Sequence, residues 1–284
     1  MGTTNGTDAP AAALVDRYRP RTLAAIRGQD AIVRALRRYA AAPVPVGMVF
    51  EGATGTGKTS AAMALATELG VRVDQGPMGG FYQIASGEQT GEAVRDLAAS
   101  LRLTPMLGSG WRVAVVNEAD YMSDGAARIW LDVLETLGGR CLIIFTTNQP
   151  ERLPVRFLDR CERYRFVGNG AALRGDLTKL LTEVWRAEGG PGHVPPLDAF
   201  RAIDDAGVGS FRRLLQNVAV ALRTGEVPAI EAPAPRPATG EILDWGALIA
   251  RHARGESFLD LARRTGQSWQ RIMCGIRKRT RTVA

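Results

Sequence analysis

The sequence predicts an α/β fold, in which a parallel sheet flanked by helices is followed by an all-α unit and a short helical segment. Three observations carry this prediction. Short apolar runs bounded by Pro or Gly, such as Val46–Phe50, are typical of buried parallel strands. Helix-forming stretches alternate with these runs, as in βαβ units. After Phe166 the strand patterns fade and helical periodicity remains.

Composition narrows the class of protein. With 284 residues, 45% of them hydrophobic and 23% charged, the chain is not a disordered, collagen-like or disulfide-framework protein. Its three cysteines contain no CxxC pair, so we expect neither a zinc site nor disulfides. We expect a cytoplasmic protein with no membrane association, because the sequence shows neither a signal peptide nor a run of 18 apolar residues.

The expected elements follow in chain order. The first part has, in order, a helix at Ile32–Ala42 ended by Pro43 and Pro45, a strand at Val46–Phe50, a helix at Ser60–Leu69, a strand at Val113–Val116, a helix at Asp124–Leu137 and a strand at Leu142–Phe145. The second part has helices at Ala171–Ala187, Leu197–Ala206 and Ser210–Leu222, a Pro-rich extended stretch at Glu226–Gly240, and a helical segment at Asp244–Ala284.

Gly52–Thr59 reads GATGTGKT and matches the phosphate-binding pattern GxxxxGK[ST] in full. Glycines let successive backbone N–H groups turn toward phosphate oxygens, and the next helix presents its positive end to the same anion. Lys58 would reach the β- and γ-phosphates, and the Thr59 hydroxyl would ligate Mg²⁺. The structural alternative is a Gly-rich turn between a strand and a helix. The apolar run before the motif and the helix after it favour nucleotide binding.

Val113–Asp120 reads VAVVNEAD, an apolar strand that ends in polar groups. In ATPases with a phosphate-binding loop, the first polar group steadies Mg²⁺ and the second, a glutamate, polarises the attacking water. Glu118 takes the glutamate position, whereas Asn117 stands where aspartate is usual. Because an amide supplies no negative charge, we expect weak metal binding and weak turnover. The alternative is a strand that ends in a polar turn.

Four segments together resemble the AAA+ ATPases and, within them, the clamp-loader subunits, over residues 14–222. DRYRPRTLAAIRGQ, from Asp16, is similar to the segment that frames the adenine. NEADYMSDGAARIWLDVLE, from Asn117, is similar to the Walker B strand end and its helix. FTTNQPERLPVRFLDRCERYRF, from Phe145, is similar to the sensor 1 strand and the Ser-Arg-Cys segment, with Asp159 in place of the serine. GSFRRLLQN, from Gly209, resembles the lid motif.

The resemblance implies a role for each matching residue. Asn148 would be sensor 1, Arg160 an arginine finger acting on ATP in a neighbouring subunit, and Arg212 sensor 2, with Arg213 as its backup. Their alternatives are a turn cap, a surface ion pair and a solvated helix face. Metal contacts would come from Thr59 and Asn117. The nucleotide would contact Tyr18, Arg19, Pro20, Gly28, Gln29, Gly52, Ala53, Thr54, Gly55, Thr56, Gly57, Lys58, Thr59 and Ser60.

The resemblance also divides the chain. Residues 1–13 would be a disordered tail, residues 14–167 the AAA+ domain, residues 168–224 a helical lid, and residues 225–241 a Pro-rich linker. Residues 242–284 would form a reduced version of the clamp-loader collar or a helix-turn-helix. This last segment holds nine Arg or Lys and three Asp or Glu, so +6 of the net charge of +7 lies there.

The basic C-terminal segment carries the DNA hypothesis. Gly266 at a turn, with Ala262 and Ile272 on either side, is similar to a helix-turn-helix. The groove and phosphate contacts would then be Gln267, Trp269, Gln270, Arg271 and Arg277. The alternative is a helical hairpin for oligomerisation with a solvated basic face.

The sequence therefore predicts an ATP- and Mg²⁺-binding clamp-loader-like ATPase of DNA replication or repair. Its expected partners are DNA (a primer–template or another duplex junction), homologous AAA+ subunits in a ring or spiral, and a sliding clamp. Two alternatives stay open: a branch-migration or related DNA motor, and a scaffold subunit that binds ATP without hydrolysing it.

Overall fold

A computed structural model of the chain describes residues 11–168, 170–192, 195, 210–226 and 245–254. The chain divides into two compact units, Met1–Ala229 and Ile230–Ala284, and each is described by itself. In the second unit the described helix is α10 (Trp245–Ala253). The helix expected at Leu197–Ala206, the Pro-rich linker and the proposed helix-turn-helix lie outside the described residues.

The first unit is built on a parallel sheet of five strands in the order β2-β3-β4-β1-β5. The strands are β1 (Val46–Glu51), β2 (Phe81–Ile84), β3 (Arg112–Val116), β4 (Cys141–Thr147) and β5 (Cys161–Arg165). The α/β prediction is confirmed. The apolar runs predicted β1, β3 and β4, whereas β2 and β5 have no such run and were not expected.

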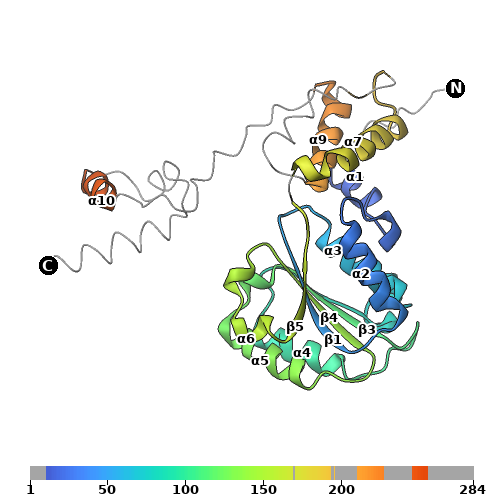
Figure 1. Cartoon of the computed structure of the whole chain (residues 1–284), viewed down its shortest axis with the longest axis vertical. Helices are drawn as coiled ribbons and strands as arrows, with labels where there is room; N and C mark the ends of the chain where they lie inside the picture. The colour runs from blue at the N-terminus through green and yellow to red at the C-terminus, as the bar shows by residue number, and fades with distance from the viewer. Residues whose placement is uncertain (1–10, 169, 193–194, 196–209, 227–244, 255–284) are drawn as a thin grey trace. The chain divides into compact units, whose positions relative to one another are not determined.

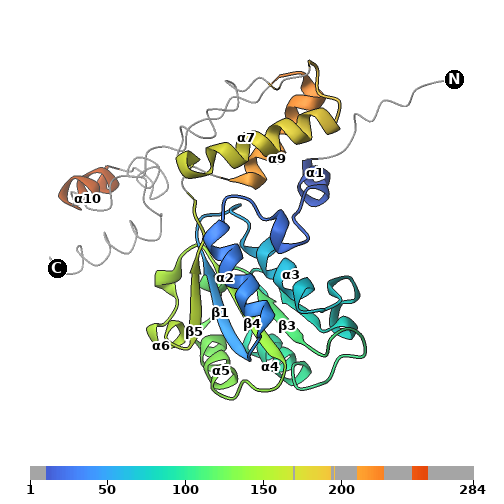
Figure 2. The same cartoon turned by 45° about the vertical axis from the view of Figure 1, so that its right-hand side comes forward.

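Helices cover both faces of the sheet (Figures 1 and 2). One face packs against α2 (Asp30–Ala41) and α3 (Lys58–Glu68). The other packs against α4 (Gly91–Ser100), α5 (Asp124–Glu135) and α6 (Val155–Leu158). Because strand side chains alternate, Met48 and Phe50 enter the first core and Val49 enters the second. Short 3₁₀ helices complete this part: η1 (Leu23–Ala25), η2 (Val73–Gly79), η3 (Ala119–Tyr121) and η4 (Pro150–Arg152).

The lid consists of α7 (Gly170–Ala187) and α9 (Phe211–Thr224), and the N-terminal helix α1 (Ala11–Arg17) packs against α9. Figure 1 shows these three helices together beyond one edge of the sheet. The Arg17 guanidinium donates two hydrogen bonds, of 2.7 and 2.8 Å, to the carboxylate of Glu188 just after α7. The N-terminal segment is therefore fastened to the lid.

The sheet topology gathers polar residues at one edge. The carboxyl ends of parallel strands lie at the same edge of a sheet, so the segments that follow β1, β3 and β4 meet there. These segments begin with Gly52, Asn117 and Asn148 respectively. In open α/β sheets this edge is where ligands bind.

In the part of the chain that the structure describes, no helix combines the length and apolarity needed to cross a bilayer.

Candidate nucleotide-binding site

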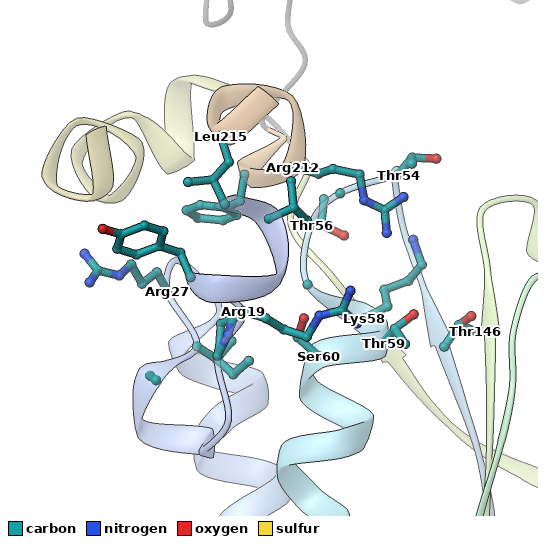
Figure 3. A pocket seen from close by; sticks show the side chains of 18 of the residues that line it. Arg19, Arg27, Thr54, Thr56, Lys58, Thr59, Ser60, Thr146, Arg212 and Leu215 are labelled. Atoms are coloured by element: carbon teal, nitrogen blue, oxygen red, sulfur yellow. The ribbon is translucent and has the colours of Figure 1, made fainter. Parts of the chain in front are cut away.

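A cavity of about 490 Å³ opens at the carboxyl edge of the sheet, beneath the lid. Four parts of the first unit line it: the N-terminal segment, the loop and helix after β1, the ends of β2, β3 and β4 with the residues that follow them, and the lid. The lining on the sheet side comprises Thr54, Gly55, Thr56, Gly57, Lys58, Thr59, Ser60, Gln83, Ser86, Asn117, Glu118, Thr146, Thr147 and Asn148. Figure 3 shows Arg212 extending from α9 toward the side of the cavity that holds Lys58 and Thr59.

The loop after β1 has the backbone of a phosphate cradle. Gly52, Gly55 and Gly57 have φ angles of 146°, 80° and 98°, which side-chain-bearing residues rarely adopt. Gly57 precedes α3, whose first N–H groups therefore point toward the loop. This combination of left-handed glycines and a helix N-terminus favours an anion.

The Lys58 ammonium forms hydrogen bonds with the backbone of this loop and with Asn148. Its Nζ donates hydrogen bonds to the carbonyl oxygens of Gly52 (2.7 Å) and Ala53 (2.8 Å) and to Oδ1 of Asn148 (2.8 Å). Lys58 and Asn148, which the sequence predicts for the nucleotide site, are therefore in contact. Gly52 and Ala53 contribute carbonyl oxygens and do not line the cavity.

The electrostatics of the loop favour a polyanion. Burial and, to a smaller extent, the charge of Arg212 lower the pKa of Lys58 to about 8, while Asp120 and Glu118 act in the opposite direction. Two cations, one from the loop and one from the lid, therefore face the same space. A negatively charged ligand between them would relieve their mutual repulsion.

The end of β3 meets the start of α3 beside the loop. The Thr59 hydroxyl donates a 3.1 Å hydrogen bond to Oδ1 of Asn117, so both predicted metal ligands lie together. Glu118 has φ 50°, and it is the one non-glycine residue with positive φ among the described residues. Its carboxylate accepts a hydrogen bond from the Ser86 hydroxyl, and its N–H donates to Oγ1 of Thr146 at 3.3 Å.

Several contacts at this edge were not predicted from the sequence. The buried Gln89 amide donates to the carbonyl oxygens of Asn117 and Glu118, the latter at 3.0 Å. Buried Asp120 accepts at Oδ1 from the Thr147 hydroxyl (2.7 Å) and from the Asn148 N–H (3.4 Å). Asp120 lies within the VAVVNEAD motif, which was a usable signal. Ser86 and Gln89 lie in a loop whose sequence matches no motif.

The N-terminal segment and the lid form the other end of the cavity. Tyr18, Arg19 and Pro20 line it, together with Leu180 and Leu215 of the lid. Gly28 and Gln29 do not line it. Gly28 lies against α7, where an added Cβ would stand 2.3 Å from Cδ2 of Leu173, and the side chain of Gln29 bonds to the backbone of Val167.

Arg160 lies away from the cavity of its own chain. Its guanidinium forms an ion pair with Glu135 at the end of α5 and donates a 2.8 Å hydrogen bond to the carbonyl oxygen of Arg156. The acidic partner is therefore Glu135, although the sequence places Asp159 next to Arg160. The Arg160 and Glu135 side chains are 37% and 52% exposed, so solvent screens their attraction.

The residues proposed for DNA contact, Gln267, Trp269, Gln270, Arg271 and Arg277, lie outside the described part of the chain.

Comparison with known proteins identifies this arrangement. A family model described as "ATPase family associated with various cellular activities (AAA)" matches residues 48–169. The replication factor C small subunit of Archaeoglobus fulgidus is 27% identical over 75% of this chain and 65% of its own length. The corresponding protein of Methanoregula boonei is 28% identical over 77% of this chain and 66% of its own length. Over these residues the chain is similar to the AAA ATPases and to the small subunits of replication factor C.

The similarity is limited in length and, for solved structures, in sequence identity. The chain spans just under two thirds of the length of these curated relatives. A solved RuvB structure from Thermotoga maritima superposes with a TM-score of 0.53 at 14% identity, covering 90% of this chain and 88% of RuvB. At that identity the likeness shows that the fold is shared and goes no further.

Proposed function

We propose that this AAA+ chain binds and hydrolyses ATP as a clamp-loader-like subunit that acts on DNA in replication or repair. The observation that carries the proposal is the meeting of Lys58, Asn148 and Arg212 around one phosphate-binding loop. The curated relatives bear the name of a replication factor, and they supply the class of process.

ATP would lie with its phosphates in the loop and its base between the N-terminal segment and the lid. The loop residues from Gly52 to Ser60 offer N–H groups and the Lys58 ammonium to the phosphates. Tyr18, Arg19 and Pro20 offer contact surface for the base and sugar, with Leu180 and Leu215 opposite them. Arg212 would meet the γ-phosphate from the lid.

The residues near Thr59 fit a magnesium ion. A hydroxyl oxygen and an amide oxygen lie 3.1 Å apart beside the loop, and oxygen donors are the ligands that Mg²⁺ takes. When bound, Mg²⁺ neutralises charge that develops on the phosphates. Because neither Thr59 nor Asn117 is negatively charged, the phosphates would contribute most of the attraction for the metal.

Hydrolysis would use Glu118 and Asn148. The Glu118 carboxylate would accept a proton from a water molecule as that water attacks the γ-phosphorus and the bond to the β-phosphate oxygen breaks. The hydrogen bond from Ser86 uses only Oε2 of Glu118, so Oε1 remains as the proton acceptor. Asn148 would orient that water against the γ-phosphate, and Asp120 accepts a hydrogen bond from the Asn148 N–H.

Arg160 would complete the ATP site of a neighbouring subunit. Its place outside its own cavity and its half-exposed side chain support action in trans, and contact with a neighbour would replace the Glu135 ion pair. An arginine finger contributes roughly 10³-fold or more to turnover.

Turnover measured against protein concentration tests this assignment. For the native chain, ATP turnover per molecule should rise as subunits associate. Arg160→Ala should remove that rise, whereas Arg156→Ala, a neighbouring arginine on α6, should keep it. Equal curves for Arg160→Ala and the native chain would refute the finger assignment.

DNA contact is proposed for the basic segment at residues 242–284, including Gln267, Trp269, Gln270, Arg271 and Arg277. Its support is the concentration of +6 charge there, which favours a phosphate backbone. Deleting residues 242–284 should lower affinity for a primer–template and flatten the salt dependence of binding. If both are unchanged, the segment is not the DNA contact.

The Asn117 amide favours one second candidate, a subunit that binds ATP and turns it over very slowly or not at all.

ATPase assays with and without a sliding clamp distinguish the main proposal from a DNA motor. A clamp-loader-like subunit should show DNA-stimulated ATPase activity that depends on the clamp, and a motor should need DNA alone.

A further inference from the structure

We infer that Gln29 is a positioning residue, which fixes the connection between sheet and lid and so holds Arg212 over the phosphate loop. This inference rests on the proposed ATP-binding function. Gln29 precedes α2 and is 2% exposed. It belongs to the segment that was predicted to contact the nucleotide, yet its side chain points elsewhere.

The side chain of Gln29 forms two hydrogen bonds with the backbone of Val167, in the segment that connects the sheet to the lid. Its Nε2 donates to the carbonyl oxygen of Val167 at 2.9 Å, and the Val167 N–H donates back to its Oε1 at 2.9 Å. One buried amide thus satisfies both backbone groups of a residue that is 138 positions away. Val167 lies between the end of β5 and the start of α7, where the chain passes from the sheet into the lid.

The end of β1 and the first residues of the phosphate loop also contact this connection. The Phe166 N–H donates a 2.7 Å hydrogen bond to the carbonyl oxygen of Glu51 at the end of β1. A Cβ added at Gly52 would stand 2.7 Å from the Phe166 carbonyl oxygen, and one at Gly168 would stand 2.9 Å from Cβ of Ala53. The connection is therefore packed between Gln29 and the first residues of the loop.

The lid meets the loop again at the start of α9. The Phe211 N–H donates a 3.0 Å hydrogen bond to the carbonyl oxygen of Gly55. The side chain of Ser210 lies so close that a Cβ on Gly55 would stand 2.0 Å from its Oγ. Arg212 is the next residue along α9, so its position depends on how the lid sits on the loop. Gln29 supports that placement through the connection that leads into α7.

ATP and ADP affinities measured by calorimetry test this role. In Gln29→Met the volume of the side chain stays and both hydrogen bonds are lost. ATP affinity should fall about 10-fold, as expected for two neutral hydrogen bonds. ADP affinity should fall less, because Arg212 would act on the γ-phosphate. The control Gln75→Ala removes an exposed amide that bonds to Asp74 and should change neither affinity.

A double-mutant cycle separates positioning from general stabilisation. If Gln29 acts through the lid arginine, Arg212→Ala and Gln29→Met should be non-additive in ATP affinity. Additive losses, or equal losses for ATP and ADP, would overturn the inference. Gln29→Leu also removes both hydrogen bonds without burying a charge and serves if the Met variant does not fold.

The two failures are distinguishable. If the native chain and Gln75→Ala bind no ATP, the proposed function is wrong. If both bind ATP and Gln29→Met binds it equally well, only the role of Gln29 is wrong.

Discussion

The phosphate loop at Gly52–Thr59 and the strand-end turn at Asn117–Asp120 lie at the same edge of the sheet and are built in opposite ways. In the loop, three glycines take left-handed conformations at no steric cost. In the turn, Glu118 takes a positive φ with a full side chain, at an energetic cost. Side chains from elsewhere, Ser86 and Gln89, hold that turn in place.

The two regions differ in what their function depends on: the loop binds the nucleotide, and the turn positions Glu118 for turnover. A loop made of backbone N–H groups depends on one side chain, Lys58, for its charge. A turn held by several side chains depends on each of them for the position of Glu118. We therefore expect changes in the loop to alter nucleotide binding, and changes in the turn to alter turnover at nearly constant binding.

Lys58→Ala should have the largest effect on binding. It removes the ammonium that contacts the loop and Asn148, so ATP affinity should fall about 100-fold or more, as for a charge-assisted contact to phosphate. Calorimetry measures the change. Lys179→Ala, on the exposed side of α7, is the matched control and should bind ATP normally.

Glu118→Gln should lower turnover and leave nucleotide binding nearly unchanged. Losing the proton acceptor should lower ATP turnover about 100-fold, while ATP affinity stays within about 3-fold. Single-turnover hydrolysis and equilibrium binding measure the two quantities separately. A large loss of affinity with normal turnover would show that the two regions do not divide the tasks in this way.

Asn117→Asp changes the charge of the turn and leaves its size nearly the same. A carboxylate next to Thr59 would add the negative charge that Mg²⁺ prefers, and we expect turnover at low Mg²⁺ to rise about 10-fold. Titration of activity with Mg²⁺ measures the shift. An unchanged Mg²⁺ requirement would remove Asn117 from the metal site.

A rise in pH should act on the loop through Lys58. Its pKa of about 8 means that the side chain is mostly charged at pH 7 and mostly neutral at pH 9. Since the charged form binds phosphate, ATP affinity should fall about 10-fold across that interval. Lys58→Ala should lack this dependence. Affinity that stays level to pH 9 in the native chain would contradict the prediction.

The sequence predicted the loop better than the turn. Gly, Lys and Thr in GATGTGKT are required by local geometry, so a short window contains the whole signal. The strand β5 reads CERYR and lies at the sheet edge with mostly exposed side chains, so it has no apolar pattern to detect. The roles of Gln89 and Gln29 depend on residues 29 and 138 positions away, and no local pattern encodes those contacts.

The hydrogen bond from the Phe211 N–H to the Gly55 carbonyl oxygen has a kinetic consequence. It joins the lid to the middle of the phosphate loop through backbone atoms, so no side-chain substitution removes it directly. If a nucleotide bound in the loop can leave only when this contact breaks, its residence time would follow the frequency of lid opening. A loosened lid would then speed both entry and exit while changing the equilibrium constant less.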